Sequence, residues 1–243
     1  MSSPKERFAV LNEFRGYGNP NGPLWFVGLE GAGEWKPAHS LDADKYKKYA
    51  LGYYPFKRGE IKEDSANDGR RYTKVYDIMS KFAVVVLEGS DSSLWGWSDY
   101  RDNKLLLEGK DTFQANLYPV GKPGMDQWPA QYEELFNLPT PKDYYTELRD
   151  TRFPKLRDFH KTHRPRVTVC FGRASAKGDF ERLFELEKKD FEESDKCRFY
   201  ANGIVLCPFF DPRHMSDDRI ASSALRCVKK YLGLSATGRT AAP

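Results

Sequence analysis

Four short apolar runs, each bounded by glycine or proline, constrain the fold of this 243-residue chain more than any other feature. They cover residues 24–29, 113–120, 166–171 and 203–210, and each is rich in aromatic or β-branched side chains. Runs of this length and composition predict buried β-strands.

Amphipathic stretches lie between and after these runs. The expected helices cover residues 71–87, 128–137, 143–163, 179–193 and 217–232, with Pro154 breaking or kinking the third. Strands that alternate with helices predict an α/β fold, here a single-domain three-layer αβα sandwich around a central, mostly parallel four-stranded sheet. We expect this domain to span residues 1–233 and residues 234–243 to form a flexible tail.

The composition is that of a soluble globular protein, with 40% hydrophobic and 30% charged residues. No apolar run approaches the ~20 residues of a membrane span, and the N-terminus lacks the apolar block of a signal peptide. We therefore expect a cytoplasmic protein without membrane association, and a monomer. A net charge of +4 permits a polyanionic partner without requiring one.

The cysteines are expected to be buried free thiols. Cys170, Cys197, Cys207 and Cys227 form no C-x-x-C pair, and two of them lie inside apolar runs. Free thiols in a reducing compartment are favoured over a disulfide or a metal site, so no metal is expected.

Ligands of parallel sheets bind beyond the carboxyl ends of the strands, which directs attention to residues 30–34, 121–124, 172–175 and 211–216. The first of these loops follows Gly28 and begins with Glu30 and Gly31. It lacks the Lys-Ser/Thr of a P-loop and the third glycine of a dinucleotide fingerprint. Glu30 is thus a lone strand-end carboxylate, for which a plain glycine-rich turn is the structural alternative.

The last loop, Asp211-Pro212-Arg213-His214-Met215-Ser216, offers a second chemical group. His214 is the only histidine at the end of an expected strand; His160 and His163 lie in a basic helix end, where we expect them to be solvated. A carboxylate and an imidazole can activate water and donate a hydrogen bond to a leaving group.

With these motifs in order, the chain resembles the uracil-DNA glycosylase superfamily over roughly residues 22–232. The first family motif corresponds to Gly28-Leu29-Glu30-Gly31 and the last to the segment from Asp211 to Ser216. The stretch FQANLYPVGKP matches the family strand that carries a base-reading Asn, here Asn116. The stretch VTVCFGRAS resembles the family's apolar strand and small-residue turn.

The resemblance implies a monofunctional DNA glycosylase that needs no cofactor and hydrolyses the N-glycosidic bond of a flipped, modified or damaged pyrimidine. Glu30 would stabilise the oxocarbenium ion or orient the water, and His214 would donate to the departing base. Asn116 would bind the base edge. Gly28 and Gly31 would line the base site, with Phe113 or Tyr54 as a stacking wall.

The chain departs from the family pattern at both ends of the site. Gly31-Ala32 stands where the first motif usually has proline, and Asp211 competes with His214 for the catalytic position of the last motif. We favour His214, because the departing base needs a donor. Iron–sulfur members carry cysteines near the first motif, whereas all four here follow residue 169.

DNA contacts are expected from the polar segment 52–74, where Lys57, Arg58, Arg70 and Arg71 are interleaved with aromatic residues. Arg213 and Ser216 of the last motif are further candidates. A solvated surface is the alternative interpretation for charged loop residues of this kind.

The substrate and the function both leave alternatives. Family members that excise modified phage bases, such as glucosylated hydroxymethylcytosine, suggest a role in antiviral defence. A catalytically degraded DNA- or nucleotide-binding module of the same fold is the main rival. An unrelated α/β hydrolase is disfavoured, because the sequence has no G-x-S-x-G motif.

Overall fold

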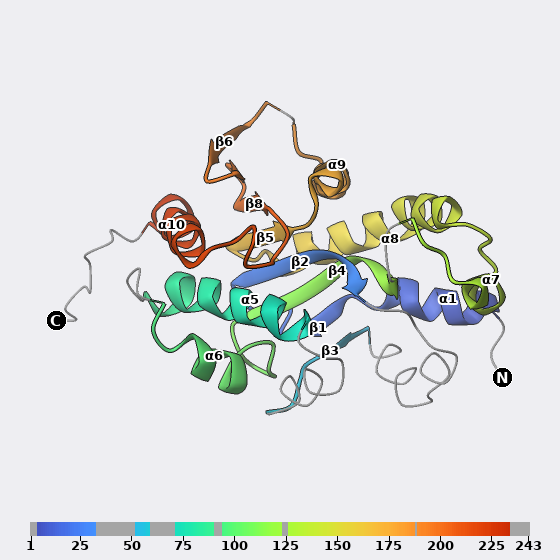
Figure 1. Ribbon diagram of the computed structural model, residues 1–243, viewed down its shortest axis with the longest axis horizontal. Coiled ribbons are helices and arrows are strands. Elements are labelled where there is room, and N and C mark those ends of the chain that lie inside the picture. Colours follow the sequence, from blue (N-terminus) through green and yellow to red (C-terminus); the bar gives the residue numbers. More distant parts are fainter. Residues whose placement is uncertain are drawn as a thin grey trace.

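The computed structural model describes residues 4–32, 52–58, 71–89, 94–122, 126–187 and 189–233 (Figure 1). Its strands are β1 (Gly16–Gly18), β2 (Leu24–Ala32), β3 (Tyr53–Tyr54), β4 (Thr112–Lys122), β5 (Val167–Phe171), β6 (Phe191–Ser194), β7 (Cys197–Tyr200) and β8 (Ile204–Cys207). They form one sheet in the order β3-β1-β4-β2-β5-β8-β7-β6. The expected tail, residues 234–243, lies outside the described part of the chain.

The four strands expected from the sequence form the centre of this sheet. β4, β2, β5 and β8 are neighbours in that order, and every pairing among them is parallel. The prediction of a four-stranded sheet was wrong, because the sheet has eight strands. Antiparallel pairings extend it, with β1 on β4 at one side and the β6–β7 hairpin on β8 at the other.

The helix predicted over residues 179–193 is too long, and its last three residues belong to the first strand of the β6–β7 hairpin. That helix ends early, because α9 (Lys177–Phe184) is followed by Glu185 in the left-handed conformation. β6 and β7 then pair through a two-residue turn, in which Asp195 and Lys196 both have positive φ. Two such residues make a type I′ turn, whose twist suits a tight hairpin.

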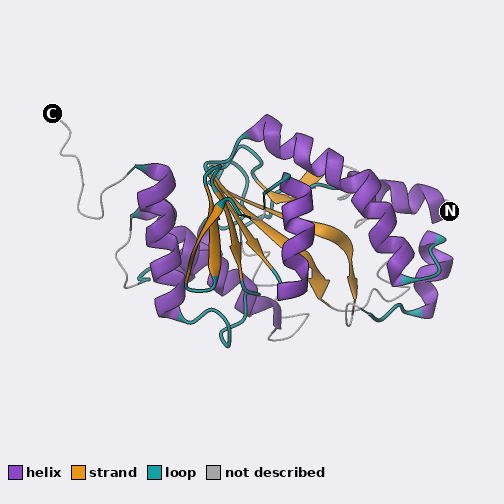
Figure 2. Cartoon of the chain, turned by 90° about the horizontal axis from the view of Figure 1, so that it is seen from above, coloured by secondary structure: helices purple, strands orange, loops and turns teal. Residues whose placement is uncertain are grey.

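Helices cover both faces of the sheet (Figure 2). They are α1 (Pro4–Glu13), α5 (Arg71–Glu88), α6 (Trp97–Asn103), α7 (Ala130–Phe136), α8 (Pro141–His163), α9 and α10 (Asp217–Cys227), the last continued by a π-helical turn, Val228–Leu232. One apolar cluster joins the sheet to α5, α6 and α10, and a second joins it to α1, α7, α8 and α9. The expected three-layer α/β arrangement therefore holds for the described residues.

α8 is the longest of these helices and carries part of the site described below. Thr140 caps its first turn by accepting a hydrogen bond from the Asp143 backbone N–H at 3.1 Å, and Pro141 occupies the first turn, where no N–H is needed. Arg164 ends it in the left-handed conformation. Pro154 lies inside the helix without ending it.

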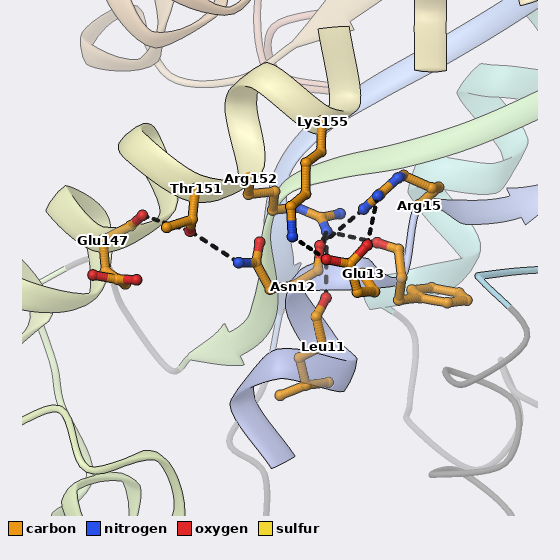
Figure 3. Close-up of polar contacts among 9 residues, drawn as sticks. Leu11, Asn12, Glu13, Arg15, Glu147, Thr151, Arg152 and Lys155 are labelled. Carbon is orange, nitrogen blue, oxygen red and sulfur yellow. Dashed lines mark hydrogen bonds and ion pairs between the residues drawn. The ribbon is translucent and has the colours of Figure 1, made fainter. Parts of the chain in front are cut away.

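Arg152 of α8 is fully buried and ties three elements together. Figure 3 shows its contacts with the end of α1. Its guanidinium donates to backbone carbonyls at the end of α1 and in the middle of β4, namely those of Leu11, Asn12, Phe14, Asn116 and Leu117. The last carbonyls of a helix have no partner within it and form the negative end of its dipole, so a buried cation is well placed there.

Two further sequence expectations can be compared with the described residues. All four cysteines are free and buried, as predicted, and the Cys197 and Cys207 sulfurs lie 3.2 Å apart on neighbouring strands. Within the part of the chain that the structure describes, no helix is both long and apolar enough to cross a bilayer.

Candidate functional site

Glu30 lies near the carboxyl end of β2, beside Tyr118 of β4. Its carboxylate forms an ion pair with Lys122 at 3.5 Å and accepts a hydrogen bond from the Tyr145 hydroxyl at 3.3 Å. Only 10% of the Glu30 side chain is exposed. The strand-end carboxylate is therefore held by a cation from the neighbouring strand and a phenol from α8, rather than facing open solvent.

Lys122 ends β4 in an aromatic surrounding. Its side chain is completely buried, and its ammonium lies 4.2 Å from the ring centre of Tyr145, 5.8 Å from that of Tyr144 and 6.0 Å from that of Trp128. The ammonium also donates to the Tyr145 hydroxyl. Ring faces attract a cation, and Glu30 supplies the opposite charge, so the lysine is well compensated despite its burial.

Burial acts on both charges of this pair. It raises the pKa of Glu30, against the opposing effects of Lys122, Tyr145 and the nearby Arg173. It lowers the pKa of Lys122, against the opposing charge of Glu30. A partly buried carboxylate with a raised pKa is typical of a group that accepts a proton or stabilises a developing positive charge.

A second polar group adjoins the first. The Tyr118 hydroxyl donates to Asp179 of α9 at 2.7 Å, and Arg149 of α8 donates to both oxygens of the same carboxylate. Next to it is a cavity of about 340 Å³, lined by Asp126, Thr140, Pro141, Lys142, Tyr145 and Arg149. Tyr145 belongs to both places, because its hydroxyl reaches Glu30 while its side chain lines the cavity.

Asn116 lies directly across from Gly28 in the β2–β4 pairing and is half-buried. A Cβ atom placed on Gly28 would stand 2.6 Å from the Asn116 side-chain oxygen and 3.1 Å from the Phe171 ring. The missing side chain of Gly28 therefore leaves room for the Asn116 amide. Gly31 continues β2 beyond Glu30. The first motif and the expected base-reading residue are thus brought together on neighbouring strands.

The last motif forms a turn before α10. Asp211 accepts hydrogen bonds from the Arg213 backbone and guanidinium, which hold its pKa well below its usual range. His214 and Ser216 are exposed, and Ser216 immediately precedes the first residue of α10. β8 runs parallel to β5, and β5 to β2, so this turn and Glu30 lie at the same edge of the sheet. No hydrogen bond or ion pair among the described residues joins His214 to Glu30.

Two candidate stacking residues lie elsewhere. Phe113 is fully buried near the start of β4, with its ring centre 4.5 Å from that of Trp25, so it packs the core and cannot contact a base. Tyr54 of β3 pairs with Tyr17 of β1, which pairs with Gln114 of β4. Glu30 pairs with Tyr118, four residues further along β4, so Tyr54 lies two strands from β4 and well before the level of Glu30. The stacking role predicted for Phe113 is therefore wrong, and that of Tyr54 stays a prediction.

His160 is also corrected, because it is not solvated. It shares a hydrogen bond with Thr168 of β5 at 2.8 Å and packs edge-on against Trp25. Burial lowers its pKa to about 4. His163 is half-buried and shares a hydrogen bond with Asn21 at 2.8 Å.

The expected DNA-contact residues are only partly described. Lys57 and Arg58 are exposed, and Arg58 donates to Asn103 of α6 at 2.7 Å. Arg71 begins α5, but its side chain lies outside the described residues, as does Arg70. Arg213 is 82% exposed and paired with Asp211.

Sequence reasoning missed Lys122 and Tyr145. Lys122 lay within the expected loop 121–124, which in the structure begins as the last two residues of β4. Its position at a strand end was therefore available as a signal. Tyr145 gave none, because a tyrosine within an amphipathic helix is usually a packing residue.

The described residues thus define an α/β protein with one mixed, mostly parallel sheet and a carboxylate–lysine pair at the carboxyl end of its first long strand. No protein-family model matches the chain, and no curated protein shows significant similarity to it.

Proposed function

We propose that the protein is a DNA glycosylase that hydrolyses the N-glycosidic bond of a flipped pyrimidine and leaves an abasic site. The observation that carries this proposal is the position of Glu30 at the carboxyl end of β2, with Asn116 opposite Gly28. After β2, the chain adds β3 and β4 on one side of β2 and then β5 on its other side. Ligands of open α/β sheets bind at such a switch point.

The chemistry requires a group for the sugar and a group for the base. Glu30 accepts a proton from the attacking water, or stabilises the positive charge that develops on the sugar as the C1′–N bond breaks. His214 donates a hydrogen bond to the base, which leaves with the bonding electrons. Asn116 binds the edge of the flipped base.

Between the two candidates of the last motif, the local electrostatics favour His214. The contacts from Arg213 keep Asp211 ionised, and an ionised carboxylate cannot donate to a departing base. Asp211 instead caps the turn that presents His214, because it accepts the Arg213 backbone N–H. His214 is exposed and free to approach a bound nucleotide.

The substrate that we propose is a modified or damaged pyrimidine. In the more specific form of this proposal the base is glucosylated hydroxymethylcytosine, and the protein acts in antiviral defence. This part rests on the family resemblance.

The test is base release from duplexes that each carry a different modified pyrimidine, followed by alkali. Wild-type protein should leave alkali-sensitive abasic sites in one of them, and Glu30→Gln should not. Glu134→Gln, which changes an exposed carboxylate of α7, is the matched control and should cleave like wild type. Equal cleavage by all three folded proteins would exclude Glu30 from the reaction.

A binding module of the same fold is the second candidate, and one observation favours it. Lys122 neutralises Glu30, and no hydrogen bond or ion pair in the described part of the chain joins Glu30 to His214. A module of this kind would bind the modified duplex tightly and leave every base in place.

A further inference from the structure

We propose that Lys122 is a positioning residue that fixes the place and the charge of the Glu30 carboxylate. This inference rests on the proposed function, because it assigns Lys122 a role in the same site. Three observations carry it: the 3.5 Å ion pair, the complete burial of the lysine, and the Tyr145 hydroxyl that contacts both partners.

The burial of Lys122 makes its charge depend on other groups of the protein. An ammonium without access to water needs compensation, and among the described residues Lys122 has three aromatic rings and the Glu30 carboxylate close to it. Asp126 also acts on Lys122 but is exposed, so solvent screens it. Among the described residues, Glu30 is therefore the main electrostatic partner of Lys122.

The same pair opposes the upward shift that burial gives the pKa of Glu30. A carboxylate that is only 10% exposed favours its protonated form unless a cation or a donor stabilises the charge. Among the described residues, the groups that act on Glu30 are Lys122 from β4, Tyr144 and Tyr145 from α8, and Arg173 after β5. Arg173 is exposed and the two tyrosines carry no positive charge, so Lys122 is the only buried cation among these groups.

Tyr145 connects the pair to the cavity. Its hydroxyl accepts from Lys122 and donates to Glu30, which fixes the order of the three groups. A ligand in the cavity would contact Tyr145, whereas Lys122 is not among the residues that line it. Lys122 thus acts on the reaction through Glu30, without contacting the substrate.

The experiment measures the titration of Glu30 in Lys122→Met by NMR of protein with ¹³C-labelled glutamate carboxyls, with Glu30→Gln to assign the signal. We expect the Glu30 midpoint to move upward by about one pH unit or more when the cation is lost. The acidic limb of single-turnover base release should move by the same amount. Lys161→Met, an exposed lysine at the far end of α8, is the control and should change neither.

Two results separate the inference from the function on which it rests. An unchanged Glu30 midpoint in folded Lys122→Met would overturn the inference, whatever the activity. A shifted midpoint in a protein that releases no base would support the electrostatic role of Lys122 and reject the glycosylase. If Lys122→Met does not fold, Lys122→Gln decides, because it removes the charge but keeps a donor.

Discussion

The candidate site has no room for a side chain at Gly28. A Cβ at this position would lie 2.6 Å from the Asn116 side-chain oxygen, well inside contact distance. Gly28→Ala should therefore displace Asn116 or the Phe171 ring and destabilise the protein by about 1–3 kcal/mol, measured by urea unfolding. Gly178 in α9 is the control, because nothing lies within 4 Å of its added Cβ.

Gly178→Ala should stabilise the protein by roughly 0.5–1 kcal/mol, since it only improves helix propensity. Equal effects of the two substitutions would contradict the packing described for Gly28.

The two candidates of the last motif differ in charge, which gives a ranking of variants. His214 can donate a hydrogen bond at any protonation state, whereas Asp211 is held ionised by Arg213. His214→Ala should therefore slow single-turnover base release much more than Asp211→Asn. The reverse ranking, in two variants shown by circular dichroism to be folded, would move the catalytic position to Asp211.

At the scale of elements, Arg152 of α8 connects the end of α1 to β4. Arg152→Met would fill similar space but remove the guanidinium hydrogen bonds to buried carbonyls, and each carbonyl left without a donor costs about 1–3 kcal/mol. We expect at least about 2–3 kcal/mol of destabilisation in urea unfolding. Arg182→Met removes an exposed ion pair with Asp150 and should change stability by less than about 1 kcal/mol. A loss no larger for Arg152→Met than for Arg182→Met would contradict the structural role of Arg152.

The central elements could be predicted from sequence because each has one clear pattern. The runs that became β2, β4, β5 and β8 are apolar on both faces, as strands inside a parallel sheet must be. The edge strands could not be found in the same way. β1 and β3 are too short to show a period, and β6 has only one apolar residue among its four, which fits its position at the sheet edge.

Only part of the candidate site could be predicted from the sequence, because some of its residues meet through long-range contacts. Glu30 and Asn116 stand at strand positions that a motif can mark, and the structure places them on neighbouring strands. Lys122 and Tyr145 join the site through the pairing of β2 with β4 and the packing of α8, which are long-range contacts. Phe113 shows the opposite error, because it was assigned to the site from the sequence but is buried in the core.

At the scale of the whole molecule, His160 links stability to pH. Its pKa is lowered from 6.5 to about 4 by burial, so the folded state favours the neutral ring. The unfolded state binds the proton more readily, and stability should fall as pH drops from about 6.5 towards 4, by roughly 3 kcal/mol at most. The His160→Gln protein has no titrating group at this position, so its free energy of unfolding, measured with urea, should fall less over this pH range. Equal losses in both proteins would remove His160 from the acid response.

The most direct test of the central claim is mass spectrometry of the free bases that purified protein releases from genomic DNA and from phage DNA with modified pyrimidines. Wild-type protein should release one modified pyrimidine base in the same amount as the abasic sites that it leaves. Folded Glu30→Gln should release it about 10²–10³-fold more slowly, as expected for loss of one transition-state contact. The account would be contradicted if wild-type protein released no base from any of these DNAs, or if Glu30→Gln released it at the wild-type rate.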